Sequence, residues 1–389
     1  LMPSYPASKR LAAVGGMVAN NAGGEKTLEY GKTERYVKAL KVVLADGNEY
    51  KIQPLSVDEL AQKTSRNNFE GEIYRNTSQL IAANKKVIQD AKPDVTKNST
   101  GYNLWNIHHD GLFDLTQLFV GSQGTLGIIT EITFELITPK PHSRMLVLFL
   151  RSLENLPDIV QRVLKHQPES FESYDDNTLQ LALKFLPQLM KRMKTKDLLS
   201  LGLQFIPEIK LVVTGGLPQL VLIAEFTGHE EEEIIKRANA AKIAVSDIVA
   251  ASHVTKSEAA AEKYWTIRRE SFSLLREKVK DKHTAPFIDD FIVQPEKLPE
   301  FFPRLEAILS EYDIFYTIAG HIGSGNFHII PLMNLTNKEE RNIIPELAEK
   351  VYDLVFEFEG SMSGEHNDGL VRSPYLKKMY GEEVYKLFE

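Results

Sequence analysis

Cysteine is absent from this chain of 389 residues, which excludes disulfides, zinc–thiolate sites and cysteine-ligated iron–sulfur clusters within it. No apolar run approaches the roughly 18 residues that a membrane helix needs. A basic excess is missing too, because 46 lysines and arginines stand against 53 acidic residues and the net charge is −7. The overall charge therefore gives no sign of nucleic-acid binding. What is present is the composition of a globular protein, with 43% hydrophobic residues to form a core.

The opening sequence, LMPSYPASKRLAAVGG, does not contain the apolar core and cleavage site of a signal peptide. It also contains no pattern for the helix or strand that usually starts a domain. We therefore expect the chain to begin inside a domain. The absence of cysteine agrees with a reducing compartment. We expect a cytoplasmic protein, or one held peripherally at the inner face of the membrane.

The proline-marked sequence PKPHS, residues 139–143, separates two parts of different character. Before it, residues 37–52 predict two strands around an Asp46-Gly47 turn, since Asp-Gly between apolar runs is typical of a hairpin. Residues 57–90 predict a helical stretch, and residues 118–137 predict a strand on each side of a glycine-rich turn.

After PKPHS, strand and helix patterns alternate. Strands are predicted at 145–151, 219–228, 286–294, 313–320 and 326–334, and helices at 153–166, 230–243, 296–312 and 337–358. This order predicts an α+β sandwich with helices on one face of an antiparallel sheet. The domains predicted are 1–140, 141–345 and a C-terminal helical segment, 346–389.

Residues 184–210 mix apolar side chains with five lysines and one arginine at helical spacing. A basic amphipathic helix of this kind can lie on an anionic membrane surface. The alternative is a surface insertion that packs on its own domain. We favour the insertion, because Pro187 and Pro207 interrupt the apolar stripe.

Glycine-rich sequence occurs twice before residue 139. GGMVANNAGG, residues 15–24, would let backbone N–H groups approach phosphate oxygens closely. It does not match the GxGxxG or GxxxxGK[ST] fingerprints, which excludes a Rossmann or P-loop assignment. A tight structural turn is the alternative. GSQGTLG, residues 121–127, has the same character, and two such loops beside strands of one domain favour a large phosphate-bearing cofactor.

HIGSGNFH, residues 321–328, has a histidine at each end and small residues between them. Glycines at this density allow a tight turn or a close approach. The two imidazoles indicate a metal or a proton as the target of that approach. A glycine-rich hairpin whose histidines form only hydrogen bonds accounts for the same sequence, so the octapeptide alone leaves both interpretations open.

Six motifs, taken in order, resemble the FAD-linked oxidases of the vanillyl-alcohol-oxidase type. They are AAVGGMVANNAGGEKTLEYGKT, LKVVLADG, KNSTGYNL, FVGSQGTLGIITEITFEL, HIGSGNFH and SGEHNDGLVRSPYL. The resemblance covers essentially the whole chain, and is greatest to D-lactate dehydrogenases, the FAD subunit of glycolate oxidase and D-2-hydroxyglutarate dehydrogenases. It implies an α+β fold: the C-terminal lobe of a PCMH-type FAD-binding domain, then a ferredoxin-like α/β cap domain with an antiparallel sheet that binds substrate.

The resemblance implies that FAD lies along both glycine-rich loops. The residues implied are Gly15, Gly16, Asn20, Ala22, Gly23, Gly24, Tyr30, Gly31, Gly121, Ser122, Gly124, Thr125, Gly127 and Ile128. Gln123 departs from the family, in which many members carry glutamate. Family members also carry an N-terminal lobe that grips the FAD phosphates, and this chain begins after it. We therefore expect a fragment, or one product of a split gene, with a separate chain carrying the other lobe.

By the same resemblance, His321, His328 and Glu365 bind a divalent metal, zinc or manganese. Two imidazoles and a carboxylate suit either ion and leave coordination positions open. His366 is then the base that takes the hydroxyl proton, while hydride passes from the substrate to flavin N5. Arg268 matches the arginine that grips the substrate carboxylate, and Arg269 is its alternative.

The resemblance also narrows the substrate. Asp289 and Asp290 stand where the 2-hydroxyglutarate enzymes have a lysine for the distal carboxylate, which favours a monoacid such as D-lactate. D-2-hydroxyglutarate and glycolate are the alternative substrates. An alkyl-glycerone-phosphate synthase relative is a rival interpretation, as is a catalytically silent subunit that needs a partner chain for FAD. The electron acceptor would be a quinone, an electron-transfer flavoprotein or an iron–sulfur protein.

Overall fold

The computed structural model describes residues 1–184, 216–278 and 281–389, which divide into two compact units. The first unit comprises Leu1–Thr138 and Ser361–Glu389, and the second comprises Pro139–Gly360. The division at residue 139 falls at the start of the PKPHS segment. Apart from Lys184, the basic segment 184–210 lies outside the described residues.

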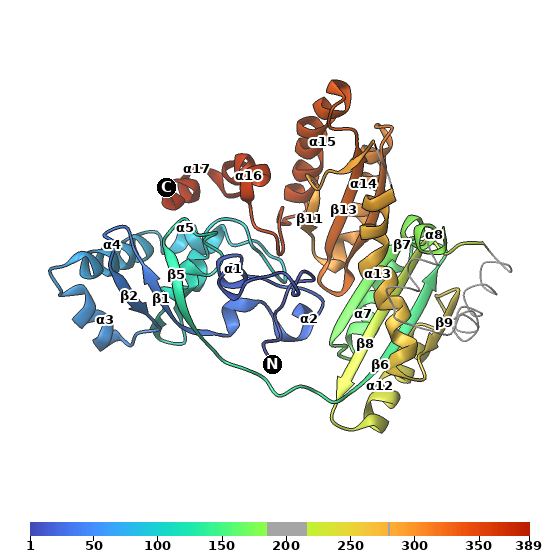
Figure 1. The fold of residues 1–389 in the computed structure, drawn as a ribbon, viewed down its shortest axis with the longest axis horizontal. Coiled ribbons are helices and arrows are strands. Elements are labelled where there is room, and N and C mark those ends of the chain that lie inside the picture. Colours follow the sequence, from blue (N-terminus) through green and yellow to red (C-terminus); the bar gives the residue numbers. More distant parts are fainter. Residues whose placement is uncertain (185–215, 279–280) are drawn as a thin grey trace. The chain divides into compact units, whose positions relative to one another are not determined.

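A three-stranded antiparallel sheet forms the centre of the first unit, in the order β2–β1–β5 (Figure 1). Its strands are β1 (Val37–Val43), β2 (Glu49–Ile52) and β5 (Ile128–Phe134). The predicted hairpin is confirmed, because β1 and β2 pair across the Asp46-Gly47 turn. Asp46 accepts a hydrogen bond of 2.6 Å from the Tyr50 hydroxyl, which ties the turn to β2.

The predicted helical stretch is present as three helices, α3 (Val57–Thr64), α4 (Phe69–Ala83) and α5 (Lys85–Asp90). Local caps explain the division. Ser56 and Glu59 form a capping box at the start of α3, and the Asn68 side chain accepts a 2.9 Å hydrogen bond from the Gly71 N–H at the start of α4. Leu40 and Ile52 of the sheet belong to one buried core with Tyr74 of α4.

The first half of the prediction for residues 118–137 is wrong. A short helix, α6 (Thr116–Phe119), precedes the glycine-rich turn where a strand was expected. Asp114 decides this, because its carboxylate accepts hydrogen bonds from the Thr116 N–H at 2.9 Å and the Thr116 hydroxyl at 2.7 Å and so starts a helix. The remaining α-helices and strands of this unit are α1 (Val14–Ala19), α2 (Thr27–Tyr30), β3 (His108–His109), β4 (Leu112–Phe113), α16 (Gly369–Arg372) and α17 (Leu376–Phe388).

In the described part of the second unit, the strands form an eight-stranded antiparallel sheet. Seven strands follow the order β10–β13–β12–β7–β8–β6–β9, and β11 also pairs with β13. The bounds are β6 (His142–Leu150), β7 (Ser170–Asp175), β8 (Leu220–Gly228), β9 (Ala251–Val254), β10 (His283–Thr284), β11 (Asp289–Ile292), β12 (Phe315–His321) and β13 (Asn326–Met333). The sequence patterns did not predict β7 or β9.

Helices bury both faces of this sheet, so the expectation of helices on one face is wrong. Consecutive residues Met145–Leu150 of β6 are all buried, although neighbours along a strand point to opposite faces. Tyr264 and Trp265 of α13 cover the face that carries Val147. Among the described residues, the α-helices of this unit are α7 (Leu156–Leu164), α8 (Asp176–Lys184), α12 (Glu231–Ala244), α13 (Glu258–Lys278), α14 (Leu298–Ser310) and α15 (Lys338–Glu357).

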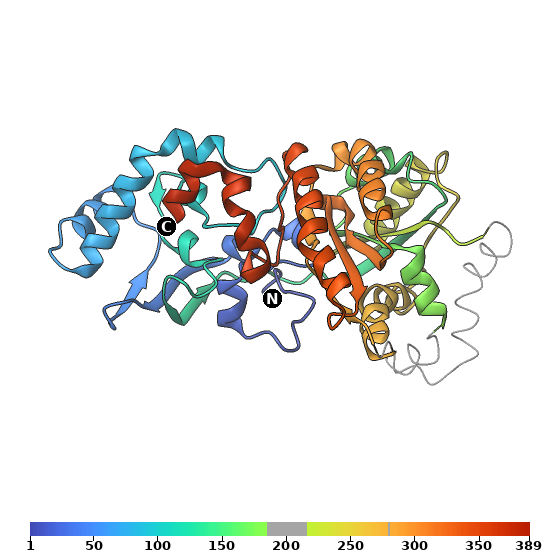
Figure 2. The same ribbon diagram turned by 90° about the horizontal axis from the view of Figure 1, so that it is seen from above.

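The other predicted strands and helices of the second unit are present within a few residues of their expected bounds. α14 and α15 pack side by side (Figure 2). α15 continues through residue 345, so this compact unit extends to Gly360. Within the described ranges, no helix is both long and apolar enough to cross a bilayer.

Candidate functional site

The first glycine-rich segment, residues 15–24, begins inside α1 and continues beyond it, with one tightly packed end and one open end. Ala22 accepts a hydrogen bond of 2.8 Å from the Thr33 hydroxyl, and a Cβ at Gly24 would overlap the carbonyl oxygen of Tyr5. Only glycine fits there. At Gly15 and Gly16, in contrast, there is room for a side chain, because no surrounding atom lies within 4 Å of the place where a Cβ would be.

Backbone hydrogen bonds join the second glycine-rich loop to the first. The Gly121 N–H donates to Val18 at 3.0 Å, and the Gln123 N–H donates to Ala19 at 2.8 Å. Gln123, the departure from the family pattern, also accepts a hydrogen bond of 3.0 Å from the Gly369 N–H through its side-chain oxygen. The two loops predicted to serve one cofactor are therefore held side by side within the first unit.

The segment that carries Glu365 is anchored to the same unit. Lys97 forms a buried ion pair with the Glu365 carboxylate, and the Asn20 side chain donates to the Glu365 carbonyl oxygen at 2.9 Å. Lys32 donates to the Gly364 carbonyl oxygen at 3.0 Å. Glu365 is buried, whereas His366 is exposed. Sequence reasoning did not single out Lys97, although it lies in the motif KNSTGYNL.

A cavity of about 550 Å³ opens beside these loops in the first unit. Asn21, Lys97, Thr100, Gly121 and Asn367 are among the residues that line it. This is the size of a pocket for a large organic ligand. Of the residues predicted to bind FAD, only Gly121 lines this cavity. What fits FAD is the open space at Gly15 and Gly16, where backbone N–H groups could approach a phosphate closely.

Burial raises the pKa of Asp368, an acidic residue of the GEHNDG segment. Asp368 is buried, and burial raises its pKa to about 6, although the Gly101 N–H and the charge of Arg372 act in the opposite direction. The Gly101 N–H donates to Asp368 at 2.8 Å. Asp368 therefore ties the GEHNDG segment to the KNSTGYNL segment.

In the second unit, HIGSGNFH forms the end of β12, a single 3-10 turn (Ile322–Ser324) and the start of β13. The hairpin alternative is thus correct for the backbone. Gly325 has φ +71, and a Cβ there would overlap the Val293 carbonyl oxygen, so the turn requires glycine. The imidazole rings of His321 and His328 lie with their centroids 5.2 Å apart.

Strand register explains why the two histidines share one face of the sheet. His328 pairs with Asp289 of β11 on one side and with Ala319 of β12 on the other. Residues that pair across strands point to the same face, as do residues two apart along a strand. His321 therefore lies on this face. The pairing of β12 with β7 places Glu172 there too.

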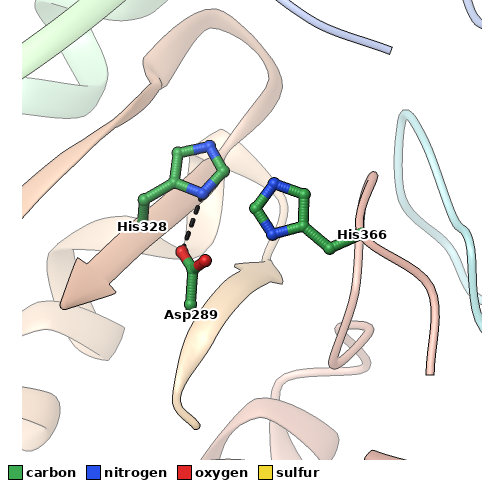
Figure 3. Close-up of side chains that lie close together, drawn as sticks. All are labelled: Asp289, His328 and His366. Carbon is green, nitrogen blue, oxygen red and sulfur yellow. Dashed lines mark hydrogen bonds and ion pairs between the residues drawn. The ribbon is translucent and has the colours of Figure 1, made fainter. Parts of the chain in front are cut away.

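Each histidine donates its Nδ1–H to a buried carboxylate. The distance is 2.6 Å from His321 to Glu172 and 2.8 Å from His328 to Asp289; Figure 3 shows the second pair. A carboxylate only accepts, so in the neutral imidazole these bonds fix the tautomer in which Nε2 carries the lone pair. This arrangement is typical of metal-binding histidines, and the residues fit a zinc or manganese ion.

Arg268 of α13 reaches the same carboxylate, with its Nη2 at 3.3 Å from Oε2 of Glu172. The Nε of Arg268 is buried and has no hydrogen-bond acceptor among the described residues. Arg269 differs, because its guanidinium lies 4.6 Å from the centre of the Trp265 ring. The second unit thus brings His321 and Arg268 together at Glu172, a residue that sequence reasoning missed, and His328 lies beside His321.

Comparison with known proteins places the chain in a family. Residues 139–389 match the model of FAD linked oxidases, C-terminal domain, and residues 1–53 match an FAD binding domain. The chain therefore belongs to the FAD linked oxidases. The family expected from the motifs is confirmed, as is an α+β fold that includes an antiparallel sheet.

Two curated relatives are similar over nearly the whole chain. The D-2-hydroxyglutarate dehydrogenase of Escherichia coli (strain K12) is 28% identical across 98% of this chain and 37% of its own length. The D-lactate dehydrogenase of Anaerostipes hadrus is 29% identical across 100% of this chain and 67% of its own length. The chain thus spans little more than a third of the first relative.

A solved structure supports the fold. p-Cresol methylhydroxylase with substrate bound matches with a TM-score of 0.61 at 14% identity, over 100% of this chain and 67% of that chain. At this identity the likeness concerns the fold alone.

Proposed function

We propose that this chain is the FAD-linked catalytic part of a D-2-hydroxyacid dehydrogenase that converts D-lactate to the 2-oxo acid. The observation that carries the proposal is the histidine pair of β12 and β13, in which both rings are oriented by buried carboxylates. The relatives named D-lactate dehydrogenase and D-2-hydroxyglutarate dehydrogenase support this class of substrate. The two glycine-rich segments would hold FAD, which would supply the hydride acceptor.

The proposed metal ligands are His321, His328 and Glu365, as the motif resemblance implies. These residues would hold a zinc or manganese ion, which would supply the positive charge that lowers the pKa of the substrate hydroxyl. Arg268 binds the substrate carboxylate, since a guanidinium offers paired N–H donors in the geometry of a carboxylate. His366, which is exposed in its own unit, accepts the hydroxyl proton.

Asp289 supports a monoacid over 2-hydroxyglutarate. Its carboxylate accepts the Nδ1–H of His328, and Asp290 beside it is buried. Neither acid supplies the positive charge that would attract a second substrate carboxylate, and the buried Asp290 carboxylate accepts a hydrogen bond of 3.0 Å from Asn326. Electrons then leave to a quinone, an electron-transfer flavoprotein or an iron–sulfur protein, either in the cytoplasm or at the inner face of the membrane.

The test is anaerobic flavin reduction by the chain co-expressed with the segment encoded directly upstream, with zinc supplied. We expect D-lactate to bleach the flavin absorbance faster than D-2-hydroxyglutarate or glycolate, and L-lactate, the matched control, to leave it unchanged. Faster bleaching by D-2-hydroxyglutarate would contradict the substrate assignment. A yellow preparation that no hydroxy acid bleaches would instead support the synthase interpretation. Absence of flavin in every preparation would support a silent subunit.

A further inference from the structure

We propose that Glu172 is a positioning residue shared by His321 and Arg268, so that the charge of Arg268 controls how tightly the chain binds its metal. The inference rests on the metal ligands and on the role of Arg268 proposed above. Beyond those roles, the proposal gives Glu172 a function, links the metal ligand His321 to Arg268 through it, and predicts that the Arg268 charge weakens metal binding.

The geometry gives each oxygen of one carboxylate a different partner. Oε1 of Glu172 accepts the Nδ1–H of His321 at 2.6 Å, and Oε2 lies 3.3 Å from Nη2 of Arg268. The Glu172 side chain is 1% exposed, so solvent does little to screen its charge. Its position is fixed by the register of β7 between β12 and β8.

The Glu172 carboxylate and the Arg268 guanidinium should have opposite effects on metal affinity. Donation of Nδ1–H to a full negative charge raises the basicity of Nε2, the ring nitrogen that would bind the metal. The guanidinium of Arg268 partly neutralises the charge of the same carboxylate. It also adds a positive charge close to the proposed metal site, which repels a metal ion. Loss of the carboxylate charge should therefore weaken metal binding, whereas loss of the guanidinium should strengthen it.

Arg269 provides a matched control. It is the next residue of α13 and carries the same charge, but it is exposed and lies over the Trp265 ring. An exposed charge is largely screened by salt. Its removal therefore changes the charge of the chain as much as removal of Arg268 does, while the hydrogen bond from His321 to Glu172 and the ion pair between Arg268 and Glu172 stay in place.

The experiment measures zinc affinity of the metal-stripped full chain by competition with a chromophoric chelator. Four proteins are compared: wild type, Glu172→Gln, Arg268→Met and Arg269→Met. We expect zinc to bind about 10- to 100-fold more weakly to Glu172→Gln. We expect it to bind about threefold or more tightly to Arg268→Met. Arg269→Met should stay within about twofold of wild type.

A merely structural role for Glu172 would weaken binding in both the Glu172→Gln and Arg268→Met variants, so weaker binding to Arg268→Met overturns the proposal. Unchanged affinity in Glu172→Gln overturns it as well. If Glu172→Gln does not fold, as judged by circular dichroism, the shift of Arg268→Met relative to Arg269→Met still decides. If the wild-type chain binds no zinc, that result contradicts both the metal centre of the proposed function and this inference. Zinc binding without hydroxy-acid oxidation would sink only the proposed activity.

Discussion

Lys97 is almost fully buried, with 2% of its side chain exposed, and its ion pair with Glu365 is buried with it. Burial of a charge costs desolvation free energy, and the attraction between the two charges offsets this cost only while both partners are present. The pair therefore holds the Glu365 side chain in a defined place within the first unit. Lys97 thus positions Glu365, a proposed metal ligand, and its removal should lower the stability of the chain.

Replacement of Lys97 by methionine should lower the free energy of unfolding by about 3 kcal/mol, because Glu365 would lose its buried cationic partner. The measurement is urea denaturation of the full chain. The matched control is Lys38→Met, since Lys38 pairs with Glu135 where the two side chains are 54% and 55% exposed. That exposed pair should cost less than about 1 kcal/mol. Equal losses in the two variants would show that Glu365 does not depend on Lys97.

At the scale of elements, the hairpin of β12 and β13 sets the spacing of the two histidines. The turn at Gly325 is tight: its backbone is in the left-handed region, and its carbonyl oxygen accepts a hydrogen bond of 3.0 Å from the Val293 N–H. The glycine is therefore needed both for its φ and for the space around it.

Replacement of Gly325 by alanine should destabilise the chain by about 3 kcal/mol or more, because a Cβ adds overlap with the Val293 carbonyl oxygen to the cost of φ +71. Gly47→Ala is the control, since Gly47 has φ +79 but no neighbouring atom within 4 Å of its Cβ position. It should cost only about 1 kcal/mol. Urea denaturation compares the two. If Gly325→Ala costs no more than Gly47→Ala, the Val293 carbonyl oxygen can move away from a Cβ at residue 325 without loss of stability.

At the scale of the whole molecule, the proposed reaction draws residues from both compact units. His321, His328 and Arg268 belong to Pro139–Gly360, whereas Glu365 and His366 belong to the Ser361–Glu389 part of the first unit. The proposed division of labour separates metal ligands from the base, and single replacements can distinguish the two roles.

Alanine at His321, His328 or Glu365 should each strip the metal and abolish turnover, while flavin absorbance is kept. Alanine at His366 should keep the metal and reduce turnover by roughly 100-fold or more, the usual contribution of a general base. Elemental analysis beside steady-state rates on the four variants makes the comparison, with the flavin spectrum as the control for folding. Metal lost from His366→Ala and kept by Glu365→Ala would mean that the two roles are exchanged.

Much of the second unit could be predicted from sequence, because its strands and helices have clear apolar periods. The exceptions are informative. β7 has the sequence SFESYD, which contains too few apolar residues to look like a central strand, yet all six residues are buried. Residues 116–119 form a helix because the Asp114 cap is local chemistry that an apolar pattern does not reveal.

The sequence by itself determined the family, the hairpin at Asp46-Gly47, the two glycine-rich loops and the histidines of HIGSGNFH. These are encoded in short runs of residues, where spacing along the chain carries the information. The tertiary structure alone decided that Glu172 stands between His321 and Arg268, and that Lys97 holds Glu365. These contacts join residues far apart in the chain, and only the register of paired strands and the packing of loops bring such residues together.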